Sequence, residues 1–489
     1  MGDRPSPIIP IPKQMRLTPG GSAWPSKVVV RCEAGPATAM AGLYESCIHG
    51  NSDGSLSIRL SQTEVPSGGY EIDLADNSIT VGALDTAGFR HALYTLSQLA
   101  SEPRAPTGQI RDWPALGVRG FHLNLAAYRR LDVDLTCRII ESAARLKLNT
   151  LLVEYGGRFP FQAHAAIRDP TAFSKQDVAR LSEVAACNGL EIIPLQQSLA
   201  HLEYALSHPS LAHLREREEK TNLLCPADPG SMALVEGLVA ELLAAHPHTK
   251  WFHLGGDEAR KFGQCPRCAS AVRESGIGAV YGRYVGTFAR RLLDRGIRPI
   301  LWDDTICAHP DALEHIPKET IIAYWDYIAV ADPTPVLIPR MAHALGGPRV
   351  VHDWRWGARR KAGTLSEAQA DVMRHYSEGV RVRAALGKAY LAEFGPYLGQ
   401  GFPRWFRALP YLEYFQARGH EVICCPTGMG NGDAENGLPN FRRFDANILT
   451  HARRCIANGK TLGLVTTMWY NMPVELIYQP LTWTAQHAW

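Results

Sequence analysis

Val118-Arg-Gly-Phe-His-Leu-Asn-Leu125 is the first of a series of segments from which the fold can be predicted. It is a short apolar run, and after it apolar side chains recur on one face of a helix, at Leu135, Ile139, Ala143 and Leu146. A second apolar run, Thr150–Glu154, comes next, and the alternation of run and helix then continues along the chain. Repeated units of this kind predict parallel strands with helices packed around them.

Six more apolar runs have the length of a strand. They are Leu190–Leu195, Trp251–Leu254, Pro299–Trp302, Ile321–Trp325, Glu421–Cys424 and Leu462–Thr466. Eight strands with intervening helices over residues 116–489 predict a (β/α)8 TIM barrel. Arg349–His352 and Arg381–Ala385 are further candidate strands, and the register between residues 330 and 415 stays open.

Residues 1–115 follow a different pattern. Lys27–Val30 and Ile79–Val81 are short β-branched runs, with glycine-rich turns between them. Thr86–Leu99 has apolar side chains at helical spacing, and Trp113-Pro114 is typical of a linker. We therefore expect a small N-terminal α/β accessory domain over residues 1–115.

The bulk composition excludes several function classes. The 489 residues carry a net charge of only +3 without a basic block, which argues against a nucleic-acid partner. The chain shows no apolar run of the roughly 18–20 residues that a membrane span needs, and its first residues lack the pattern of a signal peptide. Eleven cysteines fit a reducing compartment better than a disulfide framework, so we expect a cytoplasmic protein. A homodimer is one open alternative for its oligomeric state.

Polar and aromatic side chains follow the predicted strands, at the rim where barrels carry their functional residues. The strand ends are Glu154-Tyr155, Gln196 to His201, Asp257-Glu258, Trp302-Asp303-Asp304, Tyr324-Trp325-Asp326-Tyr327 and Met468-Trp469. Taken alone, each of these segments can be interpreted as an ordinary strand end with a structural role. Carboxylates and flat aromatic rings gathered at one rim are typical of a sugar-binding site.

The adjacent acids Asp257 and Glu258 are the sharpest signal. Successive residues of a strand point to opposite faces, so both can face the barrel mouth only if the strand has ended. Gly255-Gly256 supplies the backbone freedom for that ending. Two adjacent carboxylates can divide their roles, one staying ionised and the other acting as a general acid. The alternative is a helix start, where acidic residues are also favourable.

Cys265-Pro-Arg-Cys268 has the spacing of a zinc knuckle. A structural zinc needs two more ligands, and Cys307, Cys424 and Cys425 stand at no telling distance in the sequence. We therefore predict free thiols here, with neither a metal nor a cofactor.

In their order along the chain these motifs resemble glycoside hydrolase family 20, in particular its hexosaminidase D-like branch. Gly88–Leu99 resembles the accessory domain of that family. Arg119-Gly-Phe-His-Leu123 and Pro194–Glu203 resemble its first and third barrel strands, and His253-Leu-Gly-Gly-Asp-Glu258 is similar to its catalytic segment.

The resemblance implies an exo-acting retaining β-N-acetylhexosaminidase that removes terminal GlcNAc or GalNAc from a carbohydrate substrate. In this family the acetamido oxygen of the substrate attacks the anomeric carbon, an exception to the scheme with two carboxylates. Glu258 then serves as acid and base, and Asp257 orients the acetamide and stabilises the oxazolinium. The implied substrate contacts are Arg119, Glu154 and Asp326 for hydroxyls, Trp302, Trp325 and Trp469 as walls, Tyr324 as a donor to the acetamide, and His201 beside the carboxylates.

Two alternatives remain open. A conventional retaining β-glycosidase would use Glu154 as its nucleophile and Glu258 as its acid. A non-catalytic glycan-binding barrel is the other alternative, and two of the places where the sequence departs from the family motivate it. Asn124 stands where the family usually has Asp, and Gly156-Gly157 replaces an acidic pair.

Overall fold

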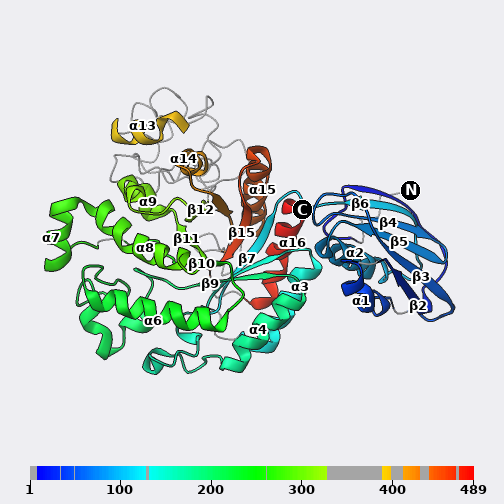
Figure 1. Cartoon of the computed structure of the whole chain (residues 1–489), viewed down its shortest axis with the longest axis horizontal. Helices are drawn as coiled ribbons and strands as arrows, with labels where there is room; N and C mark the ends of the chain where they lie inside the picture. The colour runs from blue at the N-terminus through cyan, green and yellow to red at the C-terminus, as the bar shows by residue number, and fades with distance from the viewer. Residues whose placement is uncertain are drawn as a thin grey trace, which may run out of the picture.

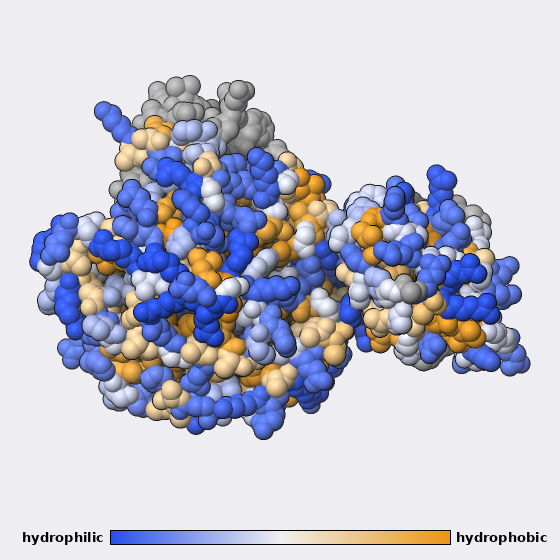
Figure 2. All heavy atoms as spheres, in the orientation of Figure 1, coloured by the Kyte–Doolittle hydropathy of each residue, from blue (hydrophilic) through white to orange (hydrophobic). Residues whose placement is uncertain are grey.

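The computed structural model describes residues 8–33, 35–48, 50–127, 131–259, 262–327, 388–397, 411–429, 440–469 and 473–489. Figure 1 shows a barrel wrapped by helices with a smaller sheet unit beside it, and the C-terminus lies at their junction. In Figure 2 the two units form two lobes that lie side by side. Among the described residues no helix combines the length and the apolar character that crossing a membrane requires.

The smaller lobe contains a six-stranded sheet in the order β1-β6-β4-β5-β3-β2. Its strands are β1 (Gln14–Thr18), β2 (Pro25–Cys32), β3 (Ser52–Gln62), β4 (Tyr70–Ala75), β5 (Ser78–Ala83) and β6 (Thr107–Asp112). Helices α1 (Ala41–Glu45) and α2 (Thr86–Leu99) pack against the sheet (Figure 1). The Asp85 carboxylate caps α2 by accepting the Gly88 N–H, and Phe89 and Leu96 are buried in the core of the lobe. The predicted α/β accessory domain is confirmed, while its boundary at residue 115 stays a prediction.

The larger lobe is a closed barrel of eight parallel strands. They are β7 (Val118–Asn124), β8 (Thr150–Glu154), β9 (Glu191–Leu195), β10 (Trp251–His253), β11 (Arg298–Trp302), β12 (Ile321–Trp325), β13 (Val422–Cys425) and β15 (Gly463–Met468). Pairing of β13 with β15 and of β15 with β7 closes the ring, and β14 (Thr427–Met429) adds to β15. All eight predicted strands are confirmed. The candidate strands Arg349–His352 and Arg381–Ala385 lie outside the described residues.

Helices surround this barrel (Figure 1). They are α3 (Val133–Arg145), α4 (Lys175–Cys187), α5 (Glu203–Leu206), α6 (Pro229–Ala245), α7 (Pro266–Ser275), α8 (Ile277–Leu293), α9 (Asp304–Ala308), α13 (Lys388–Phe394), α14 (Tyr411–Ala417), α15 (Phe441–Asn458) and α16 (Tyr478–Ala488). Local sequence explains where several begin. Ser174 and Asp177 form a capping box on α4, and Asp228 caps α6 directly before Pro229.

Each barrel strand is buried on both faces. One face packs inside the barrel, and the other packs against the surrounding helices. On β12, Ile321, Ala323 and Trp325 belong to the core inside the barrel. Ile322 and Tyr324, the alternate residues, belong to the core between strands and helices. Position along a strand therefore decides whether a side chain can reach the mouth of the barrel.

A buried polar cluster joins the two lobes at the opposite end of the barrel. The Lys147 ammonium donates to the Asp112 carboxylate over 3.1 Å and to the Tyr70 hydroxyl over 2.7 Å. The Trp489 indole N–H donates to the same carboxylate over 2.6 Å. Burial, partly offset by Asp112, lowers the pKa of Lys147 to about 8. These contacts fix the accessory sheet to the base of the barrel, away from the strand ends.

Candidate active site

The turn after β10 brings two carboxylates to the barrel mouth. The strand ends at His253, and Gly255, Gly256 and Glu258 all have positive φ, at 63°, 85° and 46°. A side chain on Gly256 would bring its Cβ within 2.6 Å of the Tyr281 hydroxyl oxygen, and Gly255 is closed in even more tightly by Gln197. The expectation that Gly255-Gly256 lets the strand end here is confirmed.

Side chains from the next elements hold this turn. The hydroxyls of Tyr281 and Thr305 both donate to the Gly256 carbonyl, over 2.9 Å and 3.0 Å. The Glu258 N–H donates to the Asp304 carboxylate over 2.8 Å. Asp304 is buried, and desolvation together with the nearby Asp257 charge raises its pKa to about 7. From the sequence, Asp304 could have either a structural or a substrate-facing role. The hydrogen bond that it accepts from the Glu258 N–H shows that Asp304 positions the backbone of Glu258.

His201, on the loop after β9, lies beside both acids. Its Nε2 is 3.4 Å from Asp257 Oδ2 and 3.8 Å from Glu258 Oε2. Burial by itself lowers the pKa of His201, but Asp257, Glu154 and Glu258 outweigh it and raise that pKa to about 10. Burial likewise opposes ionisation of Asp257, yet His201 holds the pKa of Asp257 below its usual value. His201 and Asp257 are therefore a charged pair at neutral pH.

The two acids differ in surroundings. The side chain of Asp257 is 12% exposed and that of Glu258 is 35% exposed. Asp257 Oδ1 is buried and has no hydrogen-bond partner among the described residues. An ionised carboxylate oxygen of this kind is ready to accept a hydrogen bond from a bound molecule. One acid is thus held charged and buried, while the other reaches toward solvent.

Glu154 and His122 lie on two adjacent strands of the barrel, β8 and β7. Glu154 ends β8, and its Oε2 is 3.7 Å from Nε2 of His122 on β7. Both of these atoms are buried and lack a hydrogen bond within the described part of the chain. Asn124, paired in register with Glu154, turns its side chain to the Ala127 N–H instead. The floor beside the acids therefore offers buried polar atoms that a sugar hydroxyl could satisfy.

Aromatic rings form a continuous layer from β11 to β15. The ring centroids of Trp302 and Trp469 are 5.8 Å apart, and those of Trp325 and Tyr327 are 4.8 Å apart. The Trp469 indole N–H donates to the Tyr327 hydroxyl over 2.5 Å, which joins the two pairs. The structure thus brings the three predicted tryptophans together. The structure also adds Tyr327 to this aromatic layer. Burial raises the pKa of the Tyr327 hydroxyl, and the nearby Asp257 charge contributes to the same shift.

Three predicted contacts lie elsewhere. Arg119 sits at the start of β7, where its guanidinium donates to the carbonyls of Lys147, Leu116 and Gly117 and lies over the Trp489 ring. This contradicts the expectation that Arg119 holds sugar hydroxyls, because its donors are used at the base of the barrel.

Tyr324 and Asp326 are the other two. Tyr324 faces the helices rather than the barrel interior, and its hydroxyl donates to Asp326 over 3.1 Å and accepts from Arg454 over 3.0 Å. The Asp326 carbonyl accepts from Asn447 and His451 of α15. The expectations that Tyr324 reaches the acetamide and that Asp326 binds a hydroxyl are contradicted by this orientation. A strand-parity argument on Trp325 would have pointed to Tyr327 instead.

Comparison with known proteins places this geometry in a family. Residues 119–335 match the model of the glycosyl hydrolase family 20 catalytic domain, and residues 5–113 match the model of domain 2 of the same family. Hexosaminidase D of Bos taurus is 30% identical over 201 residues, covering 38% of this chain and 56% of that protein. Hexosaminidase D of Homo sapiens is 29% identical over 245 residues, covering 48% and 50%. The chain thus spans about half the length of these curated relatives.

A solved structure extends the likeness to the whole fold. The crystal structure of the β-N-acetylhexosaminidase from Bacteroides fragilis superposes with a TM-score of 0.66 at 18% identity, covering 99% of this chain and 91% of that one. At that identity the likeness concerns the fold, and the two matched family models carry the assignment. The chain belongs to glycosyl hydrolase family 20.

Proposed function

We propose that this protein is an exo-acting retaining β-N-acetylhexosaminidase that hydrolyses terminal β-linked GlcNAc or GalNAc by substrate-assisted catalysis. The observation that carries the proposal is the buried Asp257 carboxylate, kept ionised by His201, with one oxygen that has no partner in the described residues. Family membership and the names of the curated relatives support the same activity.

The two acids then have separate tasks. The acetamido oxygen of the substrate attacks the anomeric carbon and forms a positively charged oxazolinium, while Glu258 protonates the departing oxygen. Asp257 Oδ1 accepts the acetamide N–H, and its negative charge stabilises the oxazolinium. Glu258, now a carboxylate, takes a proton from the water that opens the ring. Trp325 and Trp469 provide walls for the methyl group, Trp302 packs against Trp469 without exposed surface of its own, and Tyr327 stands beside this layer with a phenol.

A conventional mechanism remains the competing proposal, and one observation favours it. Glu154 is buried at the mouth with an oxygen that lacks a hydrogen bond in the described part of the structure. In that mechanism Glu154 forms a covalent glycosyl-enzyme and the acetamido group has no chemical task.

Substrate choice and inhibition separate the mechanisms. We expect turnover of an aryl N-acetyl-β-glucosaminide or galactosaminide, no turnover of the matching aryl β-glucoside, and strong inhibition by a thiazoline that mimics the oxazoline. Glu258→Gln should lose most of its activity, whereas Glu183→Gln, the same change at an exposed acid on α4, should not. Turnover of the simple glucoside, or unchanged activity of Glu258→Gln, would contradict the proposal. Glycan binding without any release of sugar would point to the non-catalytic alternative.

The cellular location is also a proposal. All eleven cysteines are free, including seven that are buried in the barrel lobe with no disulfide. Free thiols persist in a reducing compartment, which supports a cytoplasmic location.

A further inference from the structure

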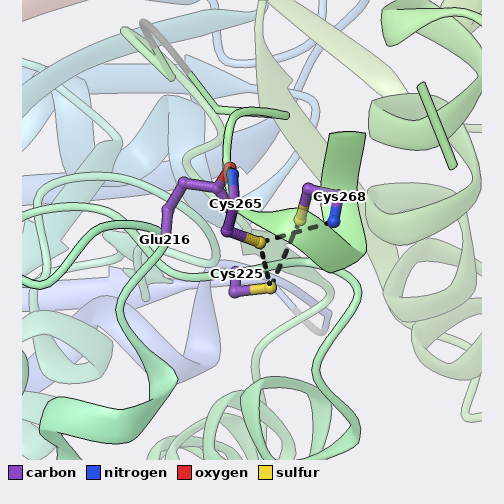
Figure 3. Close-up of side chains that lie close together, drawn as sticks. All are labelled: Glu216, Cys225, Cys265 and Cys268. Atoms are coloured by element: carbon purple, nitrogen blue, oxygen red, sulfur yellow. Dashed lines mark hydrogen bonds between the residues drawn. The ribbon is translucent and has the colours of Figure 1, made fainter. Parts of the chain in front are cut away.

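Three cysteines and a glutamate meet outside the active site. Figure 3 shows Glu216, Cys225, Cys265 and Cys268 turned toward one another. The Cys225 sulfur is 3.4 Å from that of Cys265 and 3.2 Å from that of Cys268. One potential ligand atom from each of the four residues lies within 4.8 Å of the other three. The sequence pattern supplied two of these residues, and the fold supplies the two that were missing.

The cysteine pair has the local geometry of a metal-binding knuckle. Cys265 caps helix α7, and its sulfur accepts the Cys268 N–H over 3.3 Å. Both sulfurs therefore lie at the positive end of a ten-residue helix, where negative charge is favourable. A thiolate that already accepts a backbone N–H is held in one orientation, as the ligands of structural zinc sites are.

Glu216 completes the set with an oxygen that needs a partner. Its Oε1 accepts the N–H groups of Gln264 and Cys265, over 2.6 Å and 3.0 Å. Its Oε2 is buried and has no hydrogen bond among the described residues, and the residue is only 2% exposed. Burying a carboxylate oxygen without a partner is costly, and a bound cation removes that cost.

We propose that Glu216, Cys225, Cys265 and Cys268 bind one structural zinc ion. Tetrahedral zinc with Zn–S bonds of about 2.3 Å separates its sulfurs by about 3.8 Å, so the observed sulfurs need to move apart by a few tenths of an ångström. A disulfide would instead draw two sulfurs to about 2.05 Å and leave the third thiol and the carboxylate unsatisfied. Soft thiolates favour zinc over magnesium or calcium. Four protein ligands close the coordination sphere, which is the arrangement of a structural site.

The ion would join the two loops that carry the candidate catalytic residues. Cys225 ends a short segment in which Leu223 pairs with Ala200, the neighbour of His201. Cys265 follows Glu258 by seven residues on the other loop. A metal at this position therefore fixes the loop of His201 to the loop of Asp257 and Glu258, and this consequence for activity rests on the proposed function.

Metal content tests the proposal independently of catalysis. The full chain, purified under reducing conditions with zinc in the medium, should retain one zinc per chain by elemental analysis after dialysis. Cobalt added to the metal-free protein should give a thiolate-to-metal charge-transfer band. Cys268→Ser and Glu216→Gln should lose zinc or bind it at least tenfold more weakly. Cys137→Ser, the same change at a buried cysteine on α3, should keep it.

Several outcomes would overturn the proposal. One is wild-type protein without zinc and without a charge-transfer band on adding cobalt. Another is a disulfide between any two of the three cysteines in the intact protein, detected by mass spectrometry. If the variants do not fold, zinc release from the wild-type protein on titration with a mercurial decides the question. The loss of one zinc as three thiols react supports the site, and thiols that react without any release of zinc contradict it.

Discussion

Asp257→Asn is the sharpest test of how this barrel works. The change keeps the shape of the side chain and removes its charge, so the turn held by Tyr281, Thr305 and Asp304 should stay in place. In the proposed reaction the positive charge of the oxazolinium forms beside this carboxylate. A cation about 4 Å from it gains about 4 kcal/mol at an effective dielectric constant of about 20. His201, 3.4 Å away, already neutralises part of the charge, which lowers the expected loss to about 3–4 kcal/mol.

That energy corresponds to a fall of about 10²–10³ in kcat, since each 1.36 kcal/mol is about tenfold in rate. The measurement is initial-rate kinetics with an aryl N-acetyl-β-hexosaminide, for the variant and for Asp228→Asn, the same change at the N-cap of α6. Thermal unfolding of both variants shows whether the fold survives. We expect the loss mainly in kcat, because the charge that Asp257 stabilises exists in the transition state and not in the bound substrate.

A kcat within about tenfold of wild type would contradict this prediction, since no electrostatic role near 3 kcal/mol could then be assigned to Asp257. A large loss with an equal loss in Asp228→Asn would point to folding rather than chemistry. A large loss in Glu154→Gln together with a covalent glycosyl-enzyme would favour the conventional mechanism.

Three further changes test other parts of the structure. Gly256→Ala places a Cβ at φ 85° and 2.6 Å from the Tyr281 hydroxyl oxygen. It should lower the free energy of unfolding by about 1–3 kcal/mol and remove most of the activity. A fully active variant would contradict the described turn. The pKa of His201 is raised from 6.5 to about 10 on folding, so its ion pair stabilises the fold fully below about pH 6.5 and loses that effect as the pH rises toward 10. Chemical denaturation across this range should therefore show a smaller loss of stability in His201→Gln than in wild type, and parallel curves would exclude the pair. Lys147→Met leaves the buried Asp112 without its cation and should lower the free energy of unfolding by about 3–5 kcal/mol, while Asp112→Asn in the same chain should recover part of that loss if the pair is coupled.

The eight strands could be predicted because a buried parallel strand is a short continuous apolar run, and such runs are visible without a partner. The Gly255-Gly256 turn was equally visible, since only glycine tolerates that backbone beside Gln197 and Tyr281. The direction in which individual side chains point was harder to predict from the sequence. Arg119, Tyr324 and Asp326 belong to the right segments, yet the parity and depth of their strands turn them to the base or to the helices. Instead, Tyr327 joins the aromatic layer, and Asp304 holds the turn of Asp257 and Glu258.

The barrel, the accessory sheet and the adjacent acids were predictable from the amino-acid sequence, because strand length, helical spacing and the Gly-Gly turn are local properties of the chain. Which charged side chains lie next to one another depends on the folded arrangement of the strands and loops. His201 reaches Asp257 across 56 positions of sequence, and Cys225 reaches Cys268 across 43. Contacts between loops at the ends of different strands depend on how the barrel closes and on the backbone path of each loop. No local pattern encodes those distances, so the ion pair and the four-residue cluster became visible when the strands were assembled.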